Sequence, residues 1–372
     1  MSDVVIVGGG LAGGAAAALL AQGGARPVLL ERESEPRDKI CGEFLSTEAQ
    51  AHLRAVGLDP ASLGGSRIGA VRIVAGDRGA EARLPFVALG LTRRRLDDAL
   101  LSHAERLGAK VERGVAVRRL SPGELETTAG RLRAPTILLA SGKHDVRGAR
   151  RETSGAVIGA IGFKSYFRLS EAMRAALEGF VEVILFEGGY AGLQLVEGGV
   201  ANLCLLVSHK RFEAVGRTWP ALLEALLREP HLARRLADSQ PLSARPLTIS
   251  DVPYGFVHRG DGDGPGLFRL GDQAAVIPSF SGDGMSIALH SARLAADAVL
   301  RGASAAQYHA ALRADVAPHV RLATWMQRRV EGWPGRHAVV FGLGLVPGAL
   351  QRFAAWTRVP EPALRRAGVA AR

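Results

Sequence analysis

The stretch 4–13, Val-Val-Ile-Val-Gly-Gly-Gly-Leu-Ala-Gly, indicates the fold class of this chain. Four apolar residues predict a buried strand, and the glycines that follow predict a turn into an alanine-rich helix. In such a turn Gly8 permits the tight bend, Gly10 lets the backbone approach a pyrophosphate, and Gly13 lets the helix pack on the strand. A second apolar strand at 28–30 completes a βαβ unit of the Rossmann type, which binds a dinucleotide.

The residue at the end of the second strand indicates which dinucleotide is bound. Glu31 lies 18 residues after Gly13, close to the spacing of about 20 at which a carboxylate accepts hydrogen bonds from ribose hydroxyls. A carboxylate repels a 2′-phosphate, so we expect FAD or NAD and not NADP as the resident nucleotide. The residues expected to contact it are Gly8, Gly10, Leu11, Ala12, Gly13, Glu31 and Arg32.

Composition excludes several classes of function. The 372 residues carry a net charge of +11, but the arginines are scattered along the chain, so we expect no nucleic-acid partner. Cys41 and Cys204 are far apart and form no metal-binding spacing, so we expect neither a metal site nor a disulfide. No apolar run is long enough to span a membrane, and Met1 precedes the first strand without a signal sequence, so we expect a cytoplasmic protein.

The order of predicted elements indicates an α/β (α+β) protein. Helices are expected at about 47–56, where Thr47 and Gln50 form a capping box, and at 94–107, 211–228 and 284–300. Period-two patterns between 156 and 207 predict a mostly antiparallel sheet. We therefore predict a discontinuous FAD-binding domain (1–66, 93–150 and 265–300), a β-sheet substrate domain (67–92 and 151–264) and a C-terminal helical segment (301–372).

A second glycine-rich segment, residues 271–285, predicts the site of a flavin ring. Asp272 follows a returning strand, where its carboxylate can accept a hydrogen bond from a ribitol hydroxyl. Backbone amides near Gly284 and Met285, at a helix start, can stabilise the negative charge of a reduced flavin. The expected contacts here are Gly271, Asp272, Gly282, Gly284 and Met285.

With these motifs, and with Arg93, Leu96 and Asp97 in an Arg-x-x-Leu-Asp pattern, the chain resembles the FAD-dependent oxidoreductases of the p-hydroxybenzoate hydroxylase type and the geranylgeranyl reductases. The resemblance covers about residues 1–300. It implies FAD as cofactor, with Arg37, Cys41, Gly42 and Arg93 as additional contacts.

Two stretches resemble the geranylgeranyl reductase branch more closely. Residues 39–44 (Lys-Ile-Cys-Gly-Glu-Phe) resemble a Cys-Gly loop near the flavin, and residues 189–194 resemble a Gly-Tyr-x-Trp motif, with Gly192 in place of the tryptophan. The resemblance implies a lipid-like, polyketide or isoprenoid substrate. Cys41, Tyr190 and Gln194 are the candidate catalytic residues; a packing role is the alternative for Cys41 and Tyr190, and a solvent-facing position is the alternative for Gln194.

One departure from the hydroxylase pattern concerns the reductant. Those enzymes have an Asp-Gly motif at a strand end that serves FAD and NADPH, whereas this chain has Ser141 before Gly142. Lys143 and Arg147 nearby still offer positive charge to a phosphate, so NADPH or NADH stays open as a transient reductant.

Three functions follow as hypotheses. The first is an FAD enzyme of secondary metabolism that reduces a double bond or dehydrogenates a hydrophobic small molecule by hydride transfer at flavin N5, with an electron-donor protein as an alternative reductant. The second is a flavin monooxygenase that hydroxylates an aromatic or polyketide ring through a C4a-hydroperoxide, and the third is a non-catalytic flavoprotein. The apolar run 338–350 predicts a buried helix pair, with peripheral membrane contact as the alternative.

Overall fold

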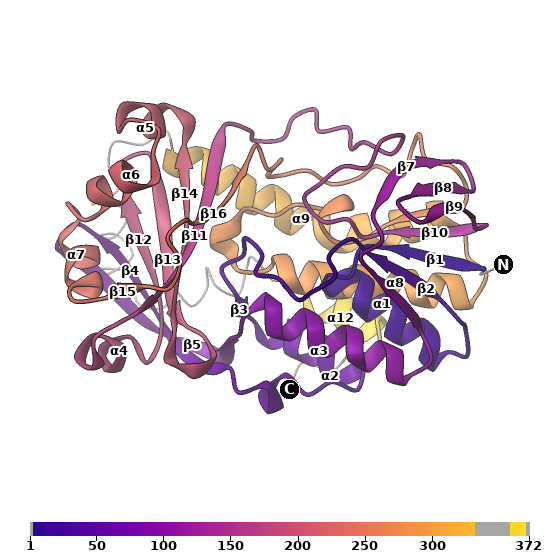
Figure 1. Cartoon of the computed structure of the whole chain (residues 1–372), viewed down its shortest axis with the longest axis horizontal. Helices are drawn as coiled ribbons and strands as arrows, with labels where there is room; N and C mark the ends of the chain where they lie inside the picture. Colours follow the sequence, from indigo (N-terminus) through magenta and orange to yellow (C-terminus); the bar gives the residue numbers. More distant parts are fainter. Residues whose placement is uncertain (1–2, 332–357, 370–372) are drawn as a thin grey trace.

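The computed structural model describes residues 3–331 and 358–369. A five-stranded parallel sheet forms one end of the molecule (Figure 1). Its strands, in spatial order, are β17 (Leu267–Arg269), β10 (Thr136–Leu139), β1 (Val4–Val7), β2 (Val28–Glu31) and β6 (Lys110–Arg113). Because β17 pairs with β10, this sheet combines the N-terminal βαβ unit with a segment from the far end of the sequence.

The two faces of the parallel sheet have different covers. Three helices and the sheet share one core: α1 (Leu11–Gln22), α3 (Arg93–Arg106) and α8 (Gly284–Leu300). A three-stranded antiparallel sheet, which the sequence analysis did not predict, packs on the other face: β7 (Val117–Ser121), β8 (Glu124–Thr127) and β9 (Gly130–Arg133). The four alanines at 15–18 in α1 are fully buried, because their small side chains allow close packing.

A nine-stranded sheet forms the other end of the molecule. Its order is β15 (Gln240–Pro241), β11 (Ala160–Arg168), β14 (Ala201–Ser208), β13 (Gly189–Leu195), β12 (Gly179–Phe186), β4 (Ser66–Ala75), β5 (Arg78–Gly90) and β3 (Phe44–Leu45), with β16 (Leu247–Ser250) also paired to β11. All pairs are antiparallel except β12 with β4. The predicted fold class, a parallel nucleotide-binding sheet with a mostly antiparallel second sheet, is confirmed.

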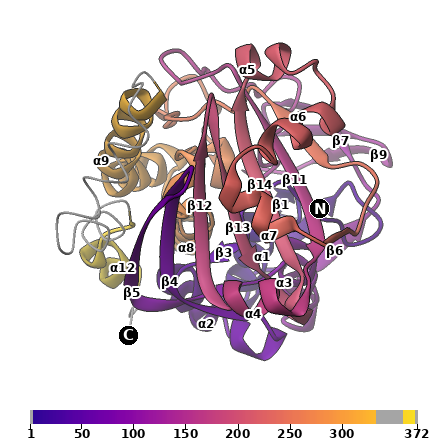
Figure 2. The ribbon, with the colours of Figure 1, turned by 90° about the vertical axis from the view of Figure 1, so that its left-hand side faces the viewer.

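The outer face of the nine-stranded sheet is covered by short helices (Figure 2). These are α4 (Glu171–Leu177), α5 (His209–Ala214), α6 (Trp219–Leu226) and α7 (Pro230–Leu236). The single helix predicted at 211–228 is wrong, because the chain turns between α5 and α6 with positive φ at Gly216 and Arg217. The inner face is directed toward the parallel sheet.

The remaining helices connect or follow these layers. They are α2 (Thr47–Ala55), α9 (Ala305–Glu331) and α12 (Glu361–Arg366), with 3-10 turns η1 (Pro60–Leu63), η2 (Glu197–Gly199), η3 (Gly271–Gln273) and η4 (Ser279–Ser281). Ser46, and not Thr47, caps α2, because its Oγ accepts from the amide of Ala49 at 3.4 Å. The run 338–350 lies outside the described residues, and within them no helix is long and apolar enough to cross a membrane.

A buried acid fixes α7 to the outer face of the sheet. The Glu182 carboxylate on β12 accepts from Arg235 Nη2 at 2.6 Å and lies 2.8 Å from His231 Nε2, and Arg72 of β4 also donates to it. Burial alone raises the pKa of an acid, but the hydrogen bonds from His231 and Arg235 lower the pKa of Glu182 to about 2.

This arrangement predicts an acid-labile contribution to stability. Because the pKa of Glu182 is lowered from 4.5 to about 2 on folding, its contribution is complete above pH 4.5 and is lost as the pH falls toward 2. Glu182→Gln should lower the free energy of unfolding at neutral pH by about 3 kcal/mol, since it leaves buried cations without their partner. Urea unfolding between pH 7 and pH 3 measures both effects.

The matched control is Glu81→Gln, which removes the exposed acid on the other side of Arg72. We expect it to change the free energy of unfolding by less than about 1 kcal/mol. An equal loss in the two variants would contradict the role of burial at Glu182.

Candidate functional site

A cavity of about 860 Å³ extends from the glycine turn after β1 to the inner face of the nine-stranded sheet. Its walls include almost every residue that the sequence predicted for the site. These are Gly8, Gly10, Leu11, Ala12, Glu31, Arg32, Arg37, Cys41, Gly42, Arg93, Tyr190, Gln194, Gly271, Asp272, Gly282, Gly284 and Met285, whereas Gly13 lies behind the wall. Residues from five separate stretches of the chain thus surround one space.

A glycine stands at each of three positions of the turn for a different physical reason. A Cβ at Gly13 would lie 1.9 Å from the carbonyl oxygen of Gly8, so no other residue fits between helix and strand. Gly8 has a φ of +105°, and a Cβ there would lie 2.5 Å from the carbonyl oxygen of Ala140. At Gly10 a Cβ would meet only the ends of two flexible side chains, so this glycine keeps cavity space open at the start of α1.

Glu31 lies beside the turn, at the carboxyl end of β2. Its Oε2 accepts from the amide of Gly9 at 2.6 Å, and its Oε1 accepts from the amide of Glu33 at 3.0 Å. The carboxylate therefore shapes the turn and lines the cavity as well. Its place agrees with the expected ribose contact, which stays a prediction.

Two cations lie at the start of α1. The Cβ position of Gly10 is 3.3 Å from Arg93 Nη2 and 3.7 Å from Lys39 Nζ. Both are held by Asp97, which accepts from Arg93 Nε at 2.8 Å and lies 3.0 Å from Lys39. Burial disfavours the charged form of Arg93, but the Asp97 carboxylate raises its pKa above the usual value. The turn thus combines a helix N-terminus with fixed positive charge, which suits a pyrophosphate.

The other predicted phosphate contacts are more exposed. Arg37 and Arg32 both pair with Glu33, at 3.1 Å and 3.0 Å, and their side chains are 69% and 56% exposed. They lie at the cavity wall near Glu31. Their role in cofactor binding stays a prediction.

The flavin half of the predicted site is open and carries charge. Within the part of the chain that the structure describes, a Cβ at Gly42, Gly142 or Gly284 would have no atom within 4 Å. Burial disfavours the ammonium of Lys143, yet the nearby Asp272 carboxylate raises its pKa. Lys143 donates to the carbonyl oxygen of Ile40 at 2.8 Å, so it also holds the loop opposite.

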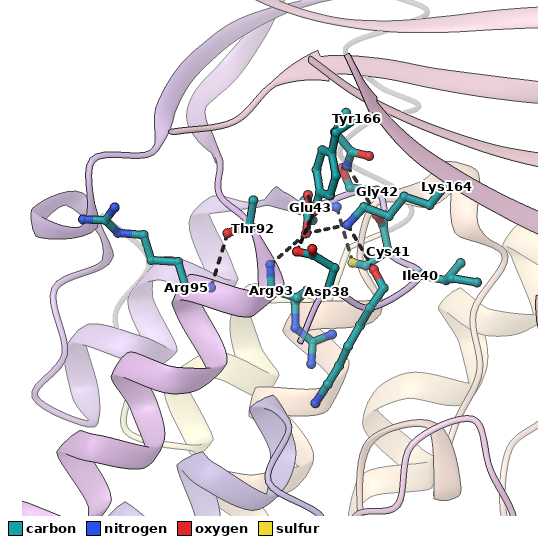
Figure 3. A network of polar contacts seen from close by, with 12 residues as sticks. Asp38, Ile40, Cys41, Gly42, Glu43, Thr92, Arg93, Arg95, Lys164 and Tyr166 are labelled. Carbon is teal, nitrogen blue, oxygen red and sulfur yellow. Dashed lines mark hydrogen bonds and ion pairs between the residues drawn. The ribbon is translucent and has the colours of Figure 1, made fainter. Parts of the chain in front are cut away.

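That loop, residues 38–44, is here called the cavity loop (Figure 3). Its Glu43 is fully buried, and its Oε1 lies 2.5 Å from Nζ of Lys164 on β11, which is also buried. The hydroxyl of Tyr166 lies 2.9 Å and 3.0 Å from the two carboxylate oxygens of Glu43, and 3.2 Å from Asp38. The amide of Arg93 donates to Glu43 at 2.8 Å.

The backbone of the cavity loop is held as firmly as its side chains. Glu43 has a φ of +61°, a conformation that an L-residue rarely adopts. Gln194 donates to the carbonyl oxygen of Glu43 at 2.9 Å, and Asn202 donates to that of Gly42 at 2.9 Å. Such contacts overcome a strain of about 1–3 kcal/mol. Gln194, predicted as a catalytic candidate, thus has a clear structural contact, and its catalytic role stays untested.

The other two catalytic candidates come from two different elements that line the cavity. The Sγ of Cys41, on the cavity loop, accepts from the amide of Glu43 at 3.3 Å. Tyr190, on β13, packs its ring edge-to-face on Phe280 with centroids 6.3 Å apart. Both line the cavity.

Strand register divides the inner sheet face into two halves. Val181 is opposite Val71 on one side and Gln194 on the other, and Gln194 is opposite Asn202. The next row contains Ile73, Val183, Gly192, Cys204 and Lys164. The half on β4 and β12 is therefore apolar, while the half on β13, β14 and β11 is polar and holds the cavity loop.

Comparisons with known proteins agree with this geometry. Residues 1–184 match a family model described as an FAD binding domain. This stretch of the chain is therefore similar to FAD-binding domains. The chain is also 26% identical over 330 residues to the menaquinone reductase of Mycolicibacterium smegmatis, an alignment that covers 81% of this chain and 77% of the relative.

Solved structures show the same fold over nearly the whole chain. The flavin-dependent brominase Bmp2 aligns with a TM-score of 0.76 at 16% identity and covers 97% of this chain and 95% of its own. A geranylgeranyl bacteriochlorophyll reductase-like protein of Thermoplasma acidophilum aligns with a TM-score of 0.73 at 19% identity, covering 98% and 95%. These likenesses confirm the p-hydroxybenzoate hydroxylase-like fold and do not select a reaction.

Sequence reasoning missed several residues of the site. Lys39 and Glu43 lie in the Cys-Gly loop motif, and Lys164, Tyr166 and Asn202 lie in the predicted antiparallel strands, but no role was expected for any of them. A lysine in an otherwise apolar strand, as at Lys164, was the available signal, because a buried cation requires a partner. The partner, Glu43, is remote in sequence.

The glycine geometry predicts separable effects of two substitutions. Gly10→Val should fold with a melting temperature close to that of the parent apoprotein, since its side chain meets only flexible ends, but it should purify with little FAD because the added atoms fill the cofactor space. Gly13→Ala should destabilise the fold, because its Cβ meets the Gly8 carbonyl. Flavin absorbance per protein and thermal melts measure the two effects. Full FAD content in the Gly10→Val protein would contradict the phosphate assignment.

The buried ion pair of Lys164 and Glu43 predicts a second set of effects, on the free energy of unfolding. Lys164→Met leaves the Glu43 carboxylate buried without its cation and should lower the free energy of unfolding by about 3–5 kcal/mol. Adding Glu43→Gln should restore part of this loss. Lys110→Met, which removes an exposed pair with Glu112, is the control and should cost less than about 1 kcal/mol. Additive effects in the double variant would show that the pair is not coupled.

Proposed function

We propose that this protein is an FAD-dependent reductase whose substrate is a quinone that carries a prenyl chain. Bound FAD supplies hydride transfer at N5. The proposal joins the FAD-binding domain to a hydrophobic substrate site, and the relative named menaquinone reductase supports the substrate class. Cytoplasmic location, with peripheral contact to the membrane that holds such lipids, belongs to the same proposal.

The observation that carries the proposal is the apolar half of the inner sheet face. Val71, Ile73, Val181, Val183 and Leu185 line the same cavity as the nucleotide turn. Each such aliphatic side chain stabilises an apolar ligand that covers it, by about 25 cal/mol for every Å² removed from water. A prenyl chain matches this surface.

In this proposal the chain's own residues bind the two halves of FAD. Gly8, Gly10, Glu31, Lys39 and Arg93 hold the adenosine and pyrophosphate of FAD. Asp272 and the amides at the start of α8 hold the ribitol and the flavin ring.

On the substrate side, Cys41 and Tyr190 lie at the cavity wall, where a thiol or a phenol can position the substrate or hold a proton for the reduced product. The apolar wall excludes water from the reacting atoms. Lys143, near Asp272, offers positive charge to a nicotinamide nucleotide that delivers electrons.

Two mixing experiments test the function. Under anaerobic conditions, the purified yellow protein is mixed with NADPH or NADH, and loss of the oxidised flavin absorbance is followed. The reduced protein, prepared with dithionite if neither nucleotide reacts, is then mixed with a prenylated naphthoquinone. We expect rapid return of the oxidised absorbance and a product that has gained two hydrogens.

Two other outcomes of these mixing experiments would favour the alternative functions. Oxygen-dependent consumption of NADPH that yields a hydroxylated substrate would show a flavin monooxygenase. Flavin that no nucleotide reduces and no quinone reoxidises would contradict the proposal and favour a non-catalytic flavoprotein.

The residue assignments predict distinct losses. Asp272→Ala should weaken FAD binding by about tenfold or more, because one charged hydrogen-bond acceptor contributes about 1.5–3 kcal/mol, while the melting temperature of the apoprotein stays near that of the parent. Cys41→Ser should keep FAD and lower the rate of quinone reduction. Unchanged turnover in this variant would show that Cys41 has a packing role and no role in the reaction.

A further inference from the structure

Two glycines lie on the inner face of the nine-stranded sheet, Gly162 on β11 and Gly192 on β13. Neither has a positive φ, so the backbone does not require glycine at either position. Register places Gly192 in the row of Val183, Cys204 and Lys164, and Gly162 opposite Leu206 in the next row. Glycine at these positions must therefore have another cause, and in a strand the usual cause is that another group approaches the backbone closely.

At Gly162 the approaching group belongs to the protein. A Cβ there would lie 3.2 Å from Cγ2 of Ile249 and 3.5 Å from Cγ2 of Ile40. Ile40 is part of the cavity loop, so Gly162 provides the recess in which that loop packs.

At Gly192 no group of the described residues fills the recess. The nearest atom to a Cβ there is the carbonyl oxygen of Cys204 at 3.6 Å, an ordinary contact distance. Gly192 lines the cavity between Tyr190 and Gln194, whose side chains point to the same face. The bare backbone of Gly192 is therefore open to whatever the cavity holds.

The surroundings of Gly192 indicate the shape of that group. It lies at the border between the apolar half of the sheet, represented by Val183, and the polar half, represented by Gln194. The rings of Tyr190 and Phe280 form an aromatic corner beside it. A flat ring with polar edges fits such a border, because its face covers bare backbone while an attached aliphatic chain continues over Val183 and Val181.

We propose that Gly192 is the specificity-determining position of the substrate site and that it accepts the planar ring of the substrate. This rests on the proposed function for the identity of the ring as a quinone. The recess itself depends only on the sheet and does not require that function.

The test is a size series at position 192, made in the FAD-loaded protein. Gly192→Ala, Gly192→Val and Gly192→Phe are titrated with two probes, a naphthoquinone with one prenyl unit and the matching prenyl alcohol without a ring, and binding is measured by calorimetry. Gly69→Phe is the control, because Gly69 lies in the same sheet, has open space at its Cβ and is not part of the cavity wall.

We expect the alanine variant to bind both probes within about threefold of the parent, and the phenylalanine variant to lose at least about tenfold for the naphthoquinone only, a typical effect of a pocket that is too small. Gly69→Phe should match the parent. If Gly192→Phe does not retain FAD, the valine variant provides the intermediate step.

The outcomes separate the two proposals. If the parent protein binds the naphthoquinone but never reduces it, the proposed function is contradicted, while the proposed role of the Gly192 recess is still supported. A phenylalanine variant that keeps FAD and binds the naphthoquinone like the parent, or that loses both probes equally, would overturn the role of Gly192. A parent that binds neither probe would overturn both.

Discussion

The fully buried ion pair of Lys164 and Glu43 is the constraint on which the site depends. Two charges taken out of water cost several kcal/mol each, and they are tolerated only where every polar atom finds a partner. Here Tyr166, the amide of Arg93 and the carbonyl of Lys39 provide those partners. The pair therefore fixes one geometry for the cavity loop and connects this loop to β11 of the nine-stranded sheet.

This connection explains why the inner sheet face is chemically divided. The polar half is occupied, since Gln194 and Asn202 donate to loop carbonyls and Lys164 and Tyr166 hold Glu43. Among the described residues, the apolar half on β4 and β12, with Gly192 at its border, stays open to a ligand. The cavity thus begins with fixed charge at the turn after β1 and ends in a hydrophobic wall, so its two ends suit ligands of different chemistry.

Local features were predictable from the sequence, while contacts between distant strands were not. The turn at Gly8 to Gly13 and the helix 284–300 depend on neighbouring residues, so spacing alone was sufficient to predict them. The role of Glu43 depends on the register of β11, which brings Lys164 to a loop more than a hundred residues away. The break between α5 and α6 was missed although local residues mark it: Gly216 and Arg217 have positive φ, Thr218 caps α6 and Pro220 lies in the first turn of α6.

The same register limits how this fold can change its substrate. A change at an inner-face position that holds the cavity loop would leave the buried Glu43 carboxylate without a partner, and a side chain at Gly162 would press on Ile249 and contact Ile40. The positions that remain free lie on β4, β12 and at Gly192. A fold does not determine a function, so proteins with this architecture can act on different molecules. In this chain, the residues whose substitution could change the ligand lie on the part of the sheet that does not hold the cavity loop.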